Sequence, residues 1–119
     1  MRDFRDLAVW GKAHQLTLAV YRETSTFLVA EIYGLTSQAR RVAASVPANI
    51  AEGCGRNGGA DFARFLQIAL GSASELEYHL LLARDLGYLN VARHETMQVD
   101  TVEVKKMLTS LIQKLRADN

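Results

Sequence analysis

The segment ADFARFLQIALGSASELEYHLLLARDL, residues 60–86, decides the fold class of this chain. Apolar residues recur in it at alternating steps of three and four for three full heptads, at Phe62, Leu66, Ala69, Ala73, Leu76, Leu80 and Ala83. This spacing is typical of one face of an α-helix. Its remaining faces are also rich in apolar side chains, namely Phe65, Ile68, Leu70, Tyr78, Leu81, Leu82 and Leu86. Because a helix that is apolar nearly all round is buried on more than one side, we expect this helix to face both a bundle core and another subunit.

Three more segments show the same helical period, and glycines separate the four. Gly34 precedes the second segment, and Gly87 follows the third in the position that favours a left-handed helix end. Asn90 is placed to cap the last helix, and no segment alternates with the period of a β-strand. The sequence therefore predicts an all-α fold, an antiparallel up-down-up-down four-helix bundle, as a single domain over residues 1–119. Its helices are expected at roughly residues 6–28, 35–53, 60–86 and 91–117.

Pro47 lies inside the second expected helix. A proline has no backbone N–H, and its ring crowds the carbonyl group four residues earlier, here that of Ala43. We therefore expect a kink or a helix break near Ala43–Pro47.

The composition indicates a soluble globular protein. The chain has 119 residues, and 14 Lys and Arg against 13 Asp and Glu leave a formal net charge of +1. That balance excludes a strongly basic nucleic-acid-binding arm and an acidic tail. The single cysteine, Cys54, excludes an internal disulfide framework and suits a reducing compartment. No apolar run reaches the ~20 residues of a membrane span, and no signal-peptide pattern opens the chain, so we expect a cytoplasmic location without membrane partners.

The glycine-rich segment Gly53–Gly58 matches the pattern G-x-G-x-x-G. A dinucleotide-binding fingerprint has to follow a β-strand, whereas residues 46–52 are expected to be helical. Two interpretations stay open: a tight turn between helices, or an anion site formed by Arg56 and the free N–H groups of the third helix.

We find no residue pattern of an enzyme, a metal site or a cofactor site. Glu75 and His79 have the wrong spacing for the Glu-x-x-His pairs of di-iron bundles, and they occur once. His14 is expected in the core and His94 in solvent, while Cys54 has no histidine nearby to act as a base. The sequence thus predicts no catalytic residues, no metal and no cofactor.

Basic and polar side chains on the second and third helices are the candidate contacts. Arg40 and Arg41 adjoin, whereas Arg56 and Arg64 flank the glycine-rich turn. A polar stripe on the second helix consists of Gln38, Arg41, Ser45, Asn49 and Glu52, and it suits a subunit contact, a ligand surface or a solvated face equally well. The candidate residues for contact with nucleic acid or a partner are Arg40, Arg41, Asn49, Glu52, Arg56 and Arg64.

Several longer motifs resemble those of the 23S rRNA intervening-sequence protein family. The most specific is Ser45-Val46-Pro47-Ala48-Asn49-Ile50-Ala51-Glu52-Gly53-Cys54-Gly55-Arg56. The others are DLAVW at 6–10, YGLTSQARR at 33–41, DFARFL at 61–66, GSASELE at 71–77 and LGYL at 86–89. The family often has a proline after the position of Phe27, where this chain reads Leu28-Val29-Ala30, so its first helix is expected to run further.

The resemblance implies a bacterial up-down helical bundle that assembles into a homopentamer. It also points to the accessory proteins of diversity-generating retroelements, basic pentamers that contact nucleic acid and a reverse transcriptase. The family has no established catalytic residues. We therefore expect a non-enzymatic oligomeric binding module for RNA or a ribonucleoprotein; the alternative is a protein-interaction scaffold without nucleic-acid binding.

Overall fold

The computed structural model describes residues 3–118, and every secondary-structure element in that range is helical. The four α-helices are α1 (Ala8–Thr24), α2 (Leu35–Cys54), α3 (Gly59–Asp85) and α4 (Val91–Ala117). Two short 3₁₀ helices, η1 (Phe4–Asp6) and η2 (Val29–Glu31), precede α1 and α2. The expected all-helical fold with four long helices is confirmed. Among residues 3–118, no helix is long and apolar enough to cross a membrane.

Two of the predicted helix ends are confirmed by their capping geometry. Asn90 accepts a hydrogen bond from the backbone N–H of Arg93 at 2.8 Å and so caps α4. After α3 the chain turns at Gly87, which has a φ of 83°, and the N–H of Tyr88 donates to the carbonyl of Ala83 at 2.9 Å.

The first helix is shorter than expected. It ends at Thr24 rather than at residue 28, and it does not run on through Leu28-Val29-Ala30. The hydroxyl groups of Ser25 and Thr26 donate to the carbonyls of Arg22 and Glu23 at 2.6 and 2.8 Å. Hydroxyl side chains that bond to nearby backbone groups compete with helix continuation, which explains the early end.

The second helix runs without a break through Pro47, so of the two outcomes expected there, a kink or a break, the break does not occur. Thr17 of α1 explains how the helix tolerates the proline. Its buried hydroxyl lies 3.0 Å from the carbonyl oxygen of Ala43, the acceptor that Pro47 leaves without a backbone donor, and 2.9 Å from that of Ala13. The single hydroxyl hydrogen of Thr17 is therefore shared between its own helix and the Ala43 carbonyl, where it supplies a donor in place of the missing N–H.

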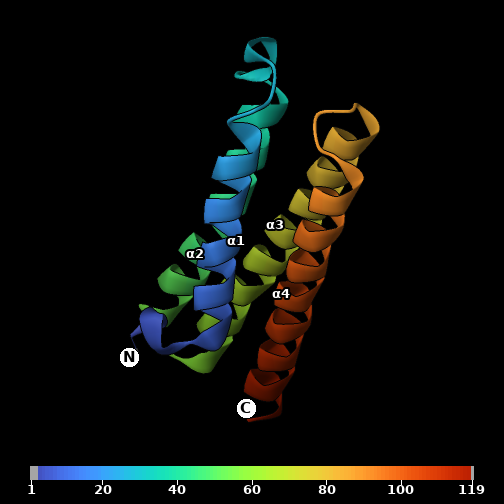
Figure 1. Cartoon of the computed structure of the whole chain (residues 1–119). Coiled ribbons are helices and arrows are strands. Elements are labelled where there is room, and N and C mark those ends of the chain that lie inside the picture. The colour runs from blue at the N-terminus through green and yellow to red at the C-terminus, as the bar shows by residue number, and fades with distance from the viewer. Residues whose placement is uncertain (1–2, 119) are drawn as a thin grey trace.

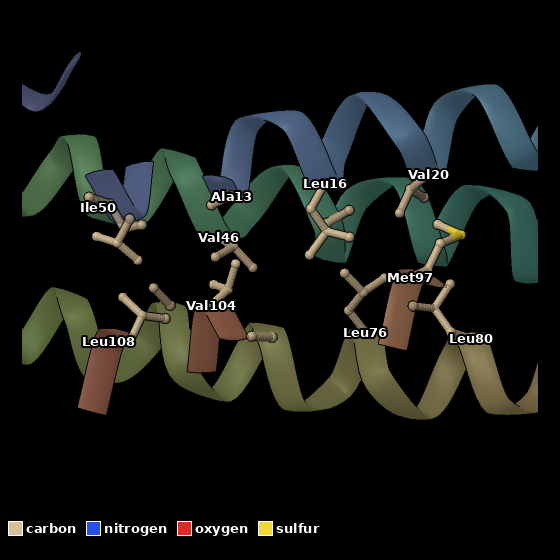
Figure 2. Packing of buried hydrophobic residues seen from close by; sticks show 14 of the residues in the cluster. Ala13, Leu16, Val20, Val46, Ile50, Leu76, Leu80, Met97, Val104 and Leu108 are labelled. Carbon is tan, nitrogen blue, oxygen red and sulfur yellow. The ribbon is translucent and has the colours of Figure 1, made fainter. Parts of the chain in front are cut away.

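The helices pack as neighbours in chain order, since α2 contacts α1 and α3, and α4 contacts α3 and α1. Figure 1 shows an elongated molecule in which both chain ends lie at the lower end of the view. Side chains of all four helices meet in the core (Figure 2) and include Leu16, Val20, Val46, Ile50, Leu76, Leu80, Met97, Val104 and Leu108. Near the C-terminal end of α2, the helices α2 and α3 approach closely at Gly53, where a Cβ atom would lie 2.9 Å from Cδ1 of Phe62.

The outer side of α3 stays exposed in the single chain. Ile68, Tyr78 and Leu81 are 42%, 58% and 36% exposed, whereas Phe65 is buried. Part of the apolar surface that extends around this helix therefore has no cover from the chain itself.

His94 is buried rather than solvated, with only 4% of its surface exposed. It lies three residues before Met97 on the stripe that faces the core, so helical position outweighs its place in the first turn of α4. His79 is also buried, and its Nε2 lies 3.9 Å from Oε2 of Glu75. His14 is half-buried and stacks on the ring of Trp10, with the ring centroids 4.9 Å apart.

Candidate functional site

A hollow of about 490 Å³ lies at the start of α2. It is lined by Tyr21 of α1, by Ile32 of the η2–α2 connection, and by the first turns of α2, namely Thr36, Ser37, Arg40, Arg41 and Ala44. Arg40 and Arg41 belong to it because they lie four residues after Thr36 and Ser37, one helical turn along α2. We call it the α2 hollow.

Arg40 is held in place by the last turn of α1. Its Nε donates to Oγ1 of Thr24 at 2.8 Å, and its Nη2 donates to the carbonyl of Tyr21 at 3.4 Å. The guanidinium carbon also lies 4.8 Å from the centre of the Tyr21 ring, within the range of a cation–π contact. These contacts orient the side chain without neutralising its charge.

Arg41 is exposed, and its Nη2 donates to Oγ of Ser37 at 3.3 Å. Below it, Thr36 is only 4% exposed, and its hydroxyl has no hydrogen-bond partner among the described residues. A buried hydroxyl without a partner is uncommon in folded proteins because its desolvation is not compensated.

The remaining arginines form a second group, the turn cluster, around the α2–α3 connection. Arg56 lies 3.6 Å from a carboxylate oxygen of Glu52, and Arg64 lies 3.1 Å from one of Asp61. Both guanidinium groups also stack on the ring of Phe65, at 4.9 and 4.5 Å from its centre. Each positive charge in the turn cluster is therefore balanced by a carboxylate three or four residues earlier in the chain.

The six candidate residues thus do not form one site. Arg40 and Arg56 are separated by 16 positions, or ~24 Å along an α-helix. Asn49 lies between the two groups, half-buried, and its side-chain amide donates to the carbonyl of Ser45 at 2.7 Å. Glu52 belongs to the turn cluster, where it balances Arg56.

Of the two groups, it is the α2 hollow that carries positive charge without compensation. Among the ion pairs of residues 3–118, none involves Arg40 or Arg41. The sequence prediction includes these two residues but not Tyr21 and Thr36, which the structure places beside them. No sequence signal identifies Tyr21, because its contact with Arg40 joins two helices, and the position of Thr36 after Gly34 suggests no more than a helix cap.

In the described part of the chain, no group of three or more His, Cys, Asp or Glu side chains is placed to hold a metal ion. Cys54 is buried at the end of α2. A second hollow lies between α3 and α4, next to Leu70, Val102 and Lys106, and its Lys105 is bound to Glu77 at 2.8 Å. These features provide no nucleophile with an adjacent base.

Comparison with known proteins identifies the relatives of this chain. Among curated protein sequences, none matches it. A solved protein of unknown function from the S23 ribosomal protein family of Bacteroides thetaiotaomicron is 30% identical, with a TM-score of 0.78 over 88% of this chain and 98% of that one. The profile of the family described as 23S rRNA-intervening sequence protein matches residues 5–110. The chain belongs to this family.

Proposed function

We propose that this chain is a non-enzymatic subunit of a homo-oligomer that binds RNA through its phosphate groups. The main observation in support is that Arg40 and Arg41 line the same hollow and have no carboxylate partner among the described residues. Unpaired arginines attract phosphates more strongly than arginines whose charge is already balanced. The family description refers to 23S rRNA and the solved relative to a ribosomal protein family, which supports RNA as the polyanion.

The proposal includes a single-domain bundle with antiparallel neighbours. Lys12 pairs with Glu103 at 3.1 Å and Glu23 with Arg93 at 3.5 Å, so a step forward along α1 corresponds to a step backward along α4. The connections between α2 and α3 and between α3 and α4 are only a few residues long, which favours antiparallel neighbours.

Self-association would place more arginines on one surface than the monomer offers. The monomer has a net charge of +1, but a ring of copies repeats each α2 hollow once per subunit. The exposed apolar side chains of α3, Ile68, Tyr78 and Leu81, support this face as the subunit contact. The pentamer is what the family resemblance implies, as is the relation to the accessory proteins of diversity-generating retroelements.

The test measures binding of a labelled, structured rRNA fragment and of a matched duplex DNA by fluorescence anisotropy across a salt series. Affinity for the RNA should fall as salt rises, and Arg41→Gln should reduce the slope of log K against log salt by about 0.7–0.9 for each phosphate that the arginine neutralises. Arg64→Gln is the matched control, because its charge is already balanced by Asp61; it should change affinity by no more than about twofold.

Two results would contradict RNA binding at this site. Equally weakened binding in the Arg41→Gln and Arg64→Gln variants would show that unpaired charge does not select the contact. Absence of binding to the RNA even at low salt would remove the proposed function altogether.

A protein-interaction scaffold is the second candidate. It is favoured by the exposed apolar side chains of the α1–α2 connection, above all Tyr33 at 94% and Val29 at 84% exposure. The scaffold predicts that a protein partner is retained after nuclease treatment and is no longer retained by a Val29→Asp/Tyr33→Asp double variant. The RNA-binding proposal predicts instead that nuclease treatment releases any protein that is captured together with this chain.

A further inference from the structure

The α2 hollow presents hydrogen-bond donors from three sources. The first turn of an α-helix leaves its backbone N–H groups without carbonyl acceptors, and Thr36 and Ser37 occupy that turn in α2. The hydroxyl of Thr36 is buried and has no partner among the described residues, and Ser37 accepts from Arg41 and so keeps its own hydroxyl hydrogen available. The guanidinium groups of Arg40 and Arg41 complete the set.

The charge of the hollow is positive, and its arginines still have donors to offer. Arg40 uses two of its roughly five guanidinium N–H groups, on Thr24 and Tyr21, which leaves about three for a ligand. Among the residues that the structure describes, no acidic one lines the hollow. An opposing charge, Glu31, precedes Ile32 of the lining; its Oε1 accepts from the N–H of Leu35 at 3.3 Å and its Oε2 accepts from the hydroxyl of Tyr88 at 3.0 Å.

We propose that the α2 hollow is a subsite for one phosphate group, bound by the first turn of α2, the hydroxyls of Thr36 and Ser37, and the guanidinium groups of Arg40 and Arg41. The subsite rests on the proposed function only for the source of the phosphate. If the chain binds RNA, the phosphate belongs to the RNA backbone; if it does not, the ligand is a free phosphate. The subsite assigns the buried hydroxyl of Thr36 a partner that the chain itself does not supply.

A phosphate fits this donor set better than a carboxylate does. A carboxylate has two oxygens in one plane and is satisfied by a single arginine in bidentate contact. A phosphate presents acceptor oxygens in several directions, which matches a helix start on one side and two guanidinium groups on another. The volume of about 490 Å³ exceeds that of one phosphate, so the hollow has room for the sugar or chain that carries it.

The experiment uses the full-length, isotope-labelled protein, titrated with sodium phosphate and, separately, with sodium chloride at equal ionic strength. We expect the backbone amide resonances of Thr36 and Ser37 to shift saturably with phosphate and to stay in place with chloride. Equal shifts with both salts would overturn the subsite, and so would phosphate-dependent shifts confined to the start of α3.

Four variants test the named contacts, and their circular dichroism spectra are recorded to confirm folding. Arg41→Gln should weaken phosphate binding about tenfold because it removes a charged hydrogen bond, while Arg64→Gln should leave it unchanged. Thr36→Val should weaken binding too, because it keeps the shape of the side chain and removes only the hydroxyl. Glu31→Gln should strengthen binding, because it removes the opposing charge while keeping the size of the half-buried side chain and an oxygen that can accept a hydrogen bond. This variant keeps the test decisive even where Thr36→Val does not fold. Unchanged phosphate binding in both Arg41→Gln and Glu31→Gln would overturn the subsite.

The RNA assay run on the same variants separates the two proposals. Specific phosphate shifts without RNA binding support the subsite and assign it to small phosphorylated ligands, while the proposed function fails. RNA binding that is insensitive to Thr36→Val and Glu31→Gln overturns the subsite as an RNA contact and leaves the proposed function standing.

Discussion

The contact between Thr17 and the carbonyl of Ala43 makes a prediction about how α2 tolerates Pro47. The Thr17 hydroxyl is buried and lies 3.0 Å from that carbonyl oxygen, which has no helical donor because of the proline. Thr17→Val removes the hydroxyl while keeping the shape of the side chain. The buried carbonyl is then left without a hydrogen-bond donor, so the folded state should be destabilised.

The expected decrease is about 1–3 kcal/mol in the free energy of unfolding, the usual cost of an unsatisfied buried polar group. For a domain of this length that corresponds to a fall in Tm of roughly 4–12 °C. In a Pro47→Ala background, residue 47 regains an N–H that donates to the carbonyl of Ala43. There Thr17→Val should cost less, by about 1 kcal/mol or more, and this difference is the coupling energy of the double-mutant cycle.

The four proteins of the cycle are compared by urea unfolding, followed by circular dichroism at one protein concentration, because self-association shifts apparent stability. Thr101→Val is the matched control: Thr101 is buried and donates to the carbonyl of Met97 at 2.7 Å, but that carbonyl keeps its helical donor. It should therefore cost less than Thr17→Val. A coupling energy within about 0.3 kcal/mol of zero would refute the reasoning.

Three further outcomes follow from individual contacts. Gly53→Ala should destabilise the fold by about 1–3 kcal/mol in urea unfolding, because the new methyl group would lie 2.9 Å from an aromatic carbon of α3. Gly71→Ala is the contrasting variant: its methyl group meets open space, so it should stabilise the fold by about 0.5–1 kcal/mol. The hydrogen bond to Glu31 raises the pKa of Tyr88 in the folded state above its ordinary value. The stability that this hydrogen bond contributes is therefore complete below about pH 10 and is lost as the pH rises through the higher folded-state pKa. Ultraviolet titration should show that Tyr88 ionises at lower pH in Glu31→Gln, and no change would contradict this. Leu81→Asp should yield a smaller species in sedimentation velocity, and an unchanged mass would exclude this part of α3 from the subunit contact.

Regular features of the helices could be predicted from the sequence. The apolar period located all four α-helices, and the chemistry of Asn90 and Gly87 located two of their ends correctly. The end of α1 was missed because it depends on where the hydroxyls of Ser25 and Thr26 donate, and both residues also occur inside helices.

Contacts between helices account for the other differences. The break expected at Pro47 depends on what faces Ala43, and periodicity does not pair a hydroxyl of α1 with a carbonyl of α2. The burial of His94 could have been predicted from the sequence, because His94 lies three positions before Met97 and so continues the core-facing stripe of α4. Its place in the first turn of α4 led to the wrong expectation.

The division of the arginines into two groups could in part have been predicted from spacing. Arg56 follows Glu52 by four residues and Arg64 follows Asp61 by three, the spacings at which helical side chains meet, and both ion pairs form. Arg40 and Arg41 have no acidic residue three or four positions away on either side; those positions hold Thr36, Ser37, Gln38, Ala43, Ala44 and Ser45. Local spacing therefore separates the arginines with a nearby carboxylate from those without one. It does not show that the last turn of α1 orients Arg40, and this contact between helices is what turns two unpaired cations into a defined site.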